Sequence, residues 1–308
     1  GFVCLSEASG KAEDAIKKAN IALKQAKEIL RGDCIEFTRE MAIKTEGRVR
    51  LLNGLRKAFD FDRLFLVYQP QVSVASGDVI GVEALMRWRT DEGEMIPPDD
   101  FIPLAESSGL IVPLGEWALN TALLELERIN NTHKTELRMG INVSALQFRH
   151  PDFLKVVQKA INNHRVQSKN IELEITESVA MLDANTAVET IQHLRQIGVH
   201  VAMDDFGTGY SSLSSLEKFR LSRLKIDKAF IDKINEKSSS SQLPEMIIKL
   251  ARDLNLDVIA EGVEHDYQFS FLKQLGCDEI QGYLFAKPVL SEQLDQWLIA
   301  HKKDQQGS

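Results

Sequence analysis

Residues 170–204 read NIELEITESVAMLDANTAVETIQHLRQIGVHVAMD, and this stretch contains one complete unit of the predicted fold. The β-branched and apolar runs 170–176 and 199–204 are typical of buried strands, and residues 184–197 between them have apolar side chains at helical spacing. Two strands that are joined by a helix pair in parallel, because the crossover returns the chain to the starting end of the sheet. The stretch therefore predicts a βαβ unit.

The same alternation extends on both sides of this unit. Eight runs have the composition of strands: 63–69, 79–86, 137–143, 170–176, 199–204, 223–227, 256–261 and 279–285. Helical patterns lie between most of them, at 115–129, 151–163, 184–197, 243–254 and 265–275. Eight alternating units over about 250 residues predict an α/β fold that closes into a TIM-like (β/α)8 barrel.

The first two runs depart from a regular barrel. Only residues 72–78 join them, too few for a crossover helix, so we expect these two strands to pair antiparallel. The predicted fold is a modified barrel with one antiparallel strand over residues 62–308. Residues 11–30 and 48–59 also have helical spacing, so we expect residues 1–61 to form a helical linker segment.

The composition is that of an acidic globular protein. The formal net charge of −8 argues against binding to nucleic-acid polymers, which needs a basic face. No run approaches the roughly 20 apolar residues of a membrane helix, and the N-terminus lacks the pattern of a signal peptide, so we expect no membrane contact by these residues. Cys4, Cys34 and Cys277 lack metal-ligand spacing and predict reduced thiols in a cytoplasmic protein.

Polar side chains lie at or near the ends of all eight runs, where apolar ones would suit a core. They are Gln69, Glu83, Arg87, Asn142, Glu174, Glu177, Asp204, Asp205, Lys225, Asp227, Glu261, Glu264 and Gln281. The active sites of such barrels lie at the carboxyl ends of the strands. We therefore expect these side chains to form one site at the mouth of the barrel, although a single one of them would ordinarily be a solvated surface position.

Carboxylates crowded at one rim repel one another unless a cation compensates them. The oxygen donors of the predicted site are Glu83, Glu174, Asp204, Asp205 and Glu261, together with the amide carbonyl of Asn142. Mg²⁺ and Mn²⁺ prefer such all-oxygen sets, whereas zinc and iron recruit imidazole or thiolate. The set therefore predicts bound Mg²⁺ or Mn²⁺.

The aspartate pair, Lys225 and Arg87 each have two interpretations. Asp204 and Asp205 precede a Gly-containing stretch where the strand can break, which would turn both carboxylates inward to hold two ions, but an aspartate pair that opens a turn is the alternative. Lys225 has apolar neighbours and predicts a buried ammonium that pairs with the carboxylates rather than a surface lysine. Arg87 would hold a phosphate oxygen or else form a surface salt bridge.

An ordered set of short motifs contains these residues. It consists of Tyr68-Gln69-Pro70, Glu83-Ala84-Leu85-Met86-Arg87-Trp88, Asn142-Val143-Ser144, Glu174-Ile175-Thr176-Glu177, Asp204-Asp205-Phe206-Gly207-Thr208-Gly209, Leu224-Lys225-Ile226-Asp227, Ala260-Glu261-Gly262-Val263-Glu264 and Gln281-Gly282-Tyr283. In order and spacing the set resembles the EAL-domain phosphodiesterases over roughly residues 62–300. Gln71 is a departure, because an apolar residue is common there in the family.

The resemblance implies a role for each matched residue. The implied ligands of two metal ions are Glu83, Asn142, Glu174 and Asp204 for the first ion, and Asp204, Asp205 and Glu261 for the second. The implied catalytic residues are Glu261 as general base, Lys225 and Gln281 around the nucleophilic water, and Glu177 as a brace for the loop after Asp205. The implied contacts with the substrate, cyclic di-GMP, are Gln69, Leu85, Arg87, Asp227, Glu264 and Tyr283.

The resemblance also implies the reaction and its setting. Such enzymes cut one phosphodiester bond of cyclic di-GMP to give linear pGpG in bacterial second-messenger signalling, and we expect a homodimer through the barrel. Residues 19–27 resemble the last helix of a GGDEF cyclase domain, but the GGDEF motif is not in this chain, so we expect no cyclase activity of these residues. Membrane anchoring of a longer parent protein through N-terminal parts is left open.

Three other functions stay open at this point. A domain that binds cyclic di-GMP without hydrolysing it would have the same motifs. A metal-dependent barrel lyase of the enolase type would need a base opposite the metal, and Lys225 is the one lysine at a predicted strand end. A scaffold would act through the helical N-terminus.

Overall fold

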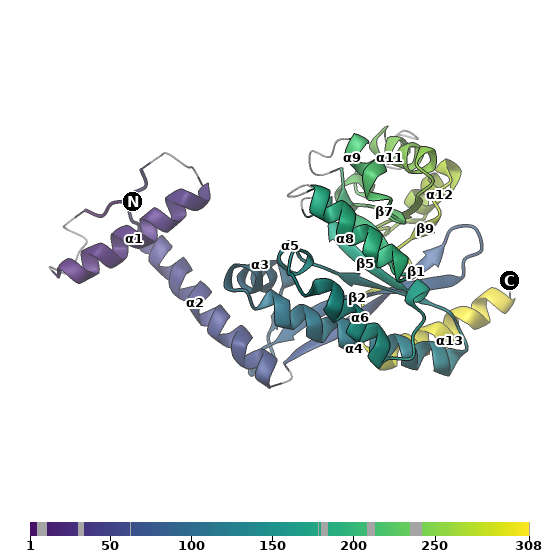
Figure 1. Cartoon of the computed structure of the whole chain (residues 1–308), viewed down its shortest axis with the longest axis horizontal. Coiled ribbons are helices and arrows are strands. Elements are labelled where there is room, and N and C mark those ends of the chain that lie inside the picture. The colour runs from purple at the N-terminus through teal and green to yellow at the C-terminus, as the bar shows by residue number, and fades with distance from the viewer. Residues whose placement is uncertain are drawn as a thin grey trace. The chain divides into compact units, whose positions relative to one another are not determined.

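In the computed structural model of the chain, eight strands close into a barrel that carries helices on its outer face (Figure 1). The structure describes residues 1–4, 11–29, 34–61, 63–177, 179, 184–207, 213–234 and 242–307. The barrel strands are β1 (Leu64–Ser73), β2 (Val79–Arg89), β4 (Arg138–Asn142), β5 (Ile171–Thr176), β6 (His200–Phe206), β7 (Arg223–Ile226), β8 (Asp257–Ala260) and β9 (Glu279–Ile280). Their order is β1-β9-β8-β7-β6-β5-β4-β2, and a β1–β2 pairing closes the ring.

Strand β1 runs against the other described strands of the barrel. It pairs antiparallel with β9, with Val72 opposite Ile280, whereas the pairs from β2 and β4 through to β8 and β9 are all parallel. A short turn leads from β1 to β2, and the Ser73 N–H donates to the Asp78 carbonyl across it. The predicted α/β barrel with one antiparallel strand is confirmed.

Helices occupy most connections between the parallel strands. They are α4 (Ile111–His133), α5 (Ala145–Phe148), α6 (Phe153–Asn163), α8 (Ala184–Gln196), α9 (Leu213–Phe219), α10 (Lys228–Ile231), α11 (Gln242–Asp253) and α12 (Asp266–Leu275), and α13 (Ser291–Gly307) follows β9. The five predicted helices correspond to α4, α6, α8, α11 and α12. Helix α13 was not predicted, because Leu294 and Leu298 are its buried apolar residues among those described, too few for a clear periodic pattern.

The apolar core lies between the outer face of the barrel and its helices. On β5, Leu173 and Ile175 are buried in this core, and on β4 Met139 and Ile141 are buried in the same way. Because side chains alternate along a strand, the residues between them face the interior of the barrel. The outer core therefore supplies the apolar packing, and the interior is left to polar side chains.

Two compact units can be distinguished in the chain. One contains Gly1–Arg63 and Trp88–Ser107, and the other contains Leu64–Arg87 and Ser108–Ser308. The first includes the predicted helices, present as α1 (Ala12–Ile29) and α2 (Arg39–Asp60), the short strand β3 (Met95–Ile96) and most of α3 (Pro98–Ser108). The division into domains 1–61 and 62–308 stays a prediction. No helix among the described residues combines the length and apolar character needed to cross a bilayer.

Ion pairs attach α13 to α4 on the outside of the barrel. Asp295 accepts from Arg128 Nη1 at 2.9 Å, and its other oxygen lies 2.7 Å from His133 Nε2. Burial raises the pKa of Asp295, but hydrogen bonds from Arg128 and His133 lower it more, so the pKa lies below its ordinary value. The C-terminal helix is therefore held to the barrel in part by the Asp295 carboxylate, which must stay ionised.

We expect Asp295→Asn to lower the free energy of unfolding by about 1 kcal/mol at neutral pH. A depressed pKa stabilises the fold above the ordinary carboxyl pKa, and this contribution is lost as the pH falls through the lower folded value. The difference between wild type and variant should therefore shrink below about pH 4. Urea unfolding at neutral and acidic pH measures it, with Glu292→Gln on the exposed side of α13 as the control; an equal difference at both pH values would contradict the assignment.

Candidate active site

Lys225 lies at the centre of the predicted site, on β7, and is 1% exposed. Its Nζ lies 2.6 Å from Glu261 Oε1, 3.3 Å from Asp204 Oδ1 and 3.7 Å from Glu83 Oε1, and it also pairs with Glu174 Oε2. We call these five residues the Lys225 cluster. Glu174, Asp204 and Glu261 are at or near the carboxyl ends of their strands, and Glu83 is on the part of β2 that pairs with β4. The predicted convergence of these four carboxylates is found here.

Negative charge is in excess in the Lys225 cluster, because four carboxylates surround one ammonium. Burial, together with repulsion from Glu83, raises the pKa of Glu174 well above its ordinary value, and burial raises that of Glu261 to about 8 although Lys225 opposes the shift. Burial alone would lower the pKa of Lys225, but Asp204 and the other carboxylates outweigh it and raise the pKa well above its ordinary value. Lys225 is therefore held in its charged form.

Side-chain amides fix both oxygens of Glu83. Asn142 Nδ2 donates to Glu83 Oε1 at 2.7 Å, and Gln281 Nε2 donates to Oε2 at 2.6 Å. Gln281 Nε2 also donates to Gln69 Oε1 at 3.0 Å, and Gln69 Nε2 donates to the carbonyl of Ala286. Asn142 and Gln281 thus orient the Glu83 carboxylate, and Gln69 in turn holds Gln281.

A β-bulge lies at Asp204 and Asp205. The pairing of β6 with β7 shifts register between Met203 and Phe206, and Asp205 has a left-handed backbone with φ of 53°. Burial raises the pKa of Asp205 to about 6, with the charges of Asp204 and Asp227 adding to the shift. The predicted break in the strand is present, and it lets two consecutive carboxylates approach one rim.

Gly140 on β4 leaves the space that the Glu174 side chain occupies. A Cβ at residue 140 would lie 2.2 Å from Glu174 Oε1, so any larger residue would displace that oxygen. Glu174 Oε1 is buried and accepts no hydrogen bond from the described residues. A buried carboxylate oxygen without a donor, in a cluster with surplus negative charge, suits a hard cation.

The type of donor atom in the Lys225 cluster therefore suits a metal ion. In the described part of the chain, no three His, Cys, Asp or Glu side chains are already arranged around a common ion position. The carboxylates contact Lys225 Nζ instead. Bound Mg²⁺ or Mn²⁺ stays a prediction.

The remaining predicted residues lie outside the Lys225 cluster. Leu85 and Arg87 are half-buried on β2, where Arg87 Nη1 donates to the Met86 carbonyl at 2.8 Å. Burial lowers the pKa of Arg87, and the charges of Glu83 and Tyr283 oppose this shift. Arg87 therefore lies within electrostatic range of Glu83 in the Lys225 cluster. Glu177 is buried directly after β5, but residues 208–212 of the loop that it is predicted to brace are outside the described residues.

At the rim, a lysine that the sequence reasoning missed contacts two predicted substrate-binding residues. Lys228 pairs with Glu264, and its Nζ lies 5.7 Å from the ring centre of Tyr283, which is 53% exposed. Lys287 lies 5.2 Å from the same ring. Asp227 caps α10 by accepting from the Ala229 N–H at 2.7 Å. Exposed cations thus flank an exposed aromatic ring near the mouth of the barrel.

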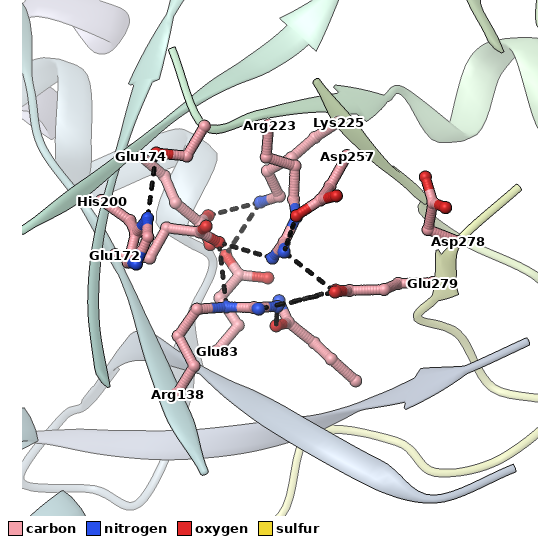
Figure 2. Close-up of polar contacts among 12 residues, drawn as sticks. Glu83, Arg138, Glu172, Glu174, His200, Arg223, Lys225, Asp257, Asp278 and Glu279 are labelled. Atoms are coloured by element: carbon pink, nitrogen blue, oxygen red, sulfur yellow. Dashed lines mark hydrogen bonds and ion pairs between the residues drawn. The ribbon is translucent and has the colours of Figure 1, made fainter. Parts of the chain in front are cut away.

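A second polar layer, also missed, lies inside the barrel nearer the amino ends of the strands. We call it the base network: Arg138, Glu172, Arg223 and Glu279 (Figure 2). Arg223 lies 3.0 Å from Glu172 and 2.8 Å from Glu279, and Arg138 lies 2.7 Å from Glu279 and 3.3 Å from Glu172. The available signal was the period of two: each of Glu172, Arg223 and Glu279 comes two residues before a predicted site residue.

Comparisons with known proteins identify the family of the chain. The EAL domain family model matches residues 52–288. The chain is 39% identical over 276 residues to the bifunctional diguanylate cyclase/cyclic di-GMP phosphodiesterase MucR of Pseudomonas aeruginosa, covering 90% of this chain and 40% of MucR. It is 38% identical over 302 residues to the cyclic di-GMP phosphodiesterase PdeR of Escherichia coli, covering 98% of this chain and 45% of PdeR.

Among solved structures, the PaMucR phosphodiesterase as a c-di-GMP complex is similar, with 41% identity and a TM-score of 0.77, covering 80% of this chain and 99% of that one. The chain thus spans less than half the length of the two curated relatives. The family match begins at residue 52, and the resemblance of residues 19–27 to a GGDEF domain stays a prediction. By its motifs, its barrel and these matches, the chain belongs to the EAL domain family.

Proposed function

We propose that this chain is a metal-dependent phosphodiesterase of bacterial signalling, which hydrolyses one phosphodiester bond of cyclic di-GMP and releases linear pGpG. MucR and PdeR bear the names of cyclic di-GMP phosphodiesterases, and the similar PaMucR structure is a c-di-GMP complex. The observation in this chain that supports the proposal most directly is the Lys225 cluster, with its surplus of buried carboxylates at the carboxyl ends of the strands.

Two divalent ions, Mg²⁺ or Mn²⁺, complete the proposed site. The first would be held by Glu83, Asn142, Glu174 and Asp204, and the second by Asp204, Asp205 and Glu261. Such ions neutralise charge on a phosphodiester and make bound water more acidic. The all-oxygen donor set and the buried, unpartnered Glu174 Oε1 support this assignment.

The protein residues bind the substrate and move one proton in this scheme. Glu261 takes a proton from a water molecule as the water oxygen bonds to phosphorus, and Lys225 orients Glu261 through their ion pair. The bond from phosphorus to the 3′ oxygen breaks, and solvent protonates the leaving oxygen. Arg87 is suited to a phosphate oxygen, because its guanidinium is half-buried beside the site.

We expect Asp204→Asn to lower kcat by two to three orders of magnitude, on the order of the loss when one charge-stabilising group of an active site is removed. The melting temperature should not fall, because the change removes one negative charge from a cluster that has too many and keeps the size of the side chain. Release of pGpG from cyclic di-GMP, followed by chromatography in Mg²⁺ and in Mn²⁺, measures the loss.

Asp257→Asn is the matched control for this experiment, because Asp257 is an exposed aspartate at the other end of a barrel strand. It should leave turnover unchanged. Wild-type turnover in Asp204→Asn would disprove its role. Binding of cyclic di-GMP by the wild type without any pGpG would instead indicate a binding module, and inertness towards the nucleotide would reopen the lyase hypothesis.

Removal of divalent ions provides an independent test. We expect a chelator to abolish hydrolysis and Mn²⁺ to raise the melting temperature, since a ligand that binds only the folded state stabilises it by about 2.7 kcal/mol at a hundredfold excess over Kd. The stabilisation should be smaller in Asp204→Asn than in the wild type. Equal activity with and without chelator would refute metal dependence.

A homodimer through the barrel stays a prediction from the family resemblance. We expect a mass of twice 34.6 kDa by light scattering during size-exclusion chromatography. A single-chain mass at all accessible protein concentrations would rule it out.

A further inference from the structure

Gln71 on β1 lies between the base network and the active site. The sequence marked it as a departure from the family, which commonly has an apolar residue there. Its side chain is fully buried inside the barrel. Gln71 Oε1 accepts from Arg138 Nη2 at 3.0 Å, and Gln71 Nε2 donates to Gln281 Oε1 at 3.0 Å. One glutamine thus connects an arginine of the base network with an amide of the active site.

The direction of this hydrogen-bond chain has only one consistent assignment. A guanidinium can only donate, so Gln71 must present its oxygen to Arg138 and its NH₂ group to Gln281. Gln281 must then present its oxygen to Gln71, which leaves its NH₂ group for Glu83 Oε2 at 2.6 Å and for Gln69 Oε1 at 3.0 Å. A carboxylate can only accept, so the chain ends correctly at Glu83.

The Arg138 end of this hydrogen-bond chain is held firmly. Arg138 is 2.7 Å from Glu279 and 3.3 Å from Glu172, and its own position is therefore set by the base network. Gly81 leaves room for the contact between Gln71 and Arg138, because a Cβ there would lie 2.7 Å from Gln71 Oε1 and 3.4 Å from Arg138 Nη2. Gln71 has little freedom to turn its amide over.

We propose that Gln71 is a positioning residue: it sets the orientation of the Gln281 amide and, through it, of the Glu83 carboxylate. With an apolar side chain at residue 71, Gln281 Oε1 loses its donor and is left buried without a hydrogen bond. The Gln281 amide would then shift to find another donor, and its hydrogen bond to Glu83 Oε2 would lose its present geometry. This inference rests on the proposed function, because it treats Glu83 as a metal ligand.

The test is Gln71→Met, which keeps the length of the side chain and removes its hydrogen bonds. We expect the affinity for Mn²⁺, titrated by electron paramagnetic resonance without substrate, to fall by about tenfold or more, in the range found when groups that orient metal ligands are removed. We expect kcat for cyclic di-GMP to fall similarly with an unchanged KM. The side-chain NH₂ signals of Gln281 in ¹⁵N-glutamine-labelled protein should also shift and exchange faster with solvent.

The control is Asp257→Asn, which alters a neighbour of the base network, at 3.4 Å from Arg223, without touching the chain through Gln71. It should leave the Mn²⁺ affinity and the Gln281 signals unchanged. Wild-type values of both in Gln71→Met would overturn the proposal. If Gln71→Met does not fold, solvent exchange in the wild type provides the test. We expect the side-chain NH₂ groups of Gln71 and Gln281 to exchange slowly with solvent. Exchange at the rate of exposed amides would overturn the proposal.

Failure of the proposed function gives a different result. A wild type that makes no pGpG refutes the phosphodiesterase, whereas the Mn²⁺ titration and the Gln281 signals are read without any substrate. An active wild type with unchanged Mn²⁺ affinity in Gln71→Met refutes only the role of Gln71.

Discussion

A buried ammonium among four carboxylates is the constraint on which the rest of the structure depends. Lys225 and its partners occupy the interior of the barrel, where charges are costly to desolvate and are tolerated only with close partners. The apolar packing that stabilises the fold is therefore on the outer face, where strands such as β5 pack against helices. The period of two along each strand lets one sequence satisfy both demands.

The two polar layers of the barrel differ in their charge balance. In the base network two arginines meet two glutamates, each within 3.3 Å of an opposite charge, so the charges compensate one another. In the Lys225 cluster one ammonium meets four carboxylates, and burial together with repulsion between the carboxylates raises the pKa values of Glu174 and Glu261. The charges of the base network balance one another, whereas the surplus negative charge of the Lys225 cluster favours the binding of a cation. This difference in charge balance distinguishes the base network from the candidate active site without any comparison with other proteins.

The sequence predicted those features that repeat over several residues. The alternation of runs predicted the barrel, and the short connection over residues 72–78 predicted its antiparallel strand. Arg138 gave no such signal, because it begins a short strand, where a charge at a solvated edge is the ordinary interpretation. From the sequence, Gln71 could be noted only as a departure from the family pattern. Its contact with Arg138 could not be predicted, because the two residues are 67 positions apart. The turn of Asp205 needed the bulge, which depends on tertiary pairing with β7.

The closure of the barrel by β1 and β9 has a consequence for the stage of folding at which the orientation of Glu83 is completed. The contact between Gln281 and Glu83 spans 198 positions of the chain, and that between Gln71 and Gln281 spans 210. Loops of this size close late, because the entropy lost on joining distant segments must be offset by contacts formed at the same time. During synthesis, Glu83 on β2 can receive its hydrogen bond from Gln281 only after β9 has left the ribosome. A chain without β9 would lack the hydrogen bond from Gln281, so the orientation of Glu83 is completed only when β9 docks.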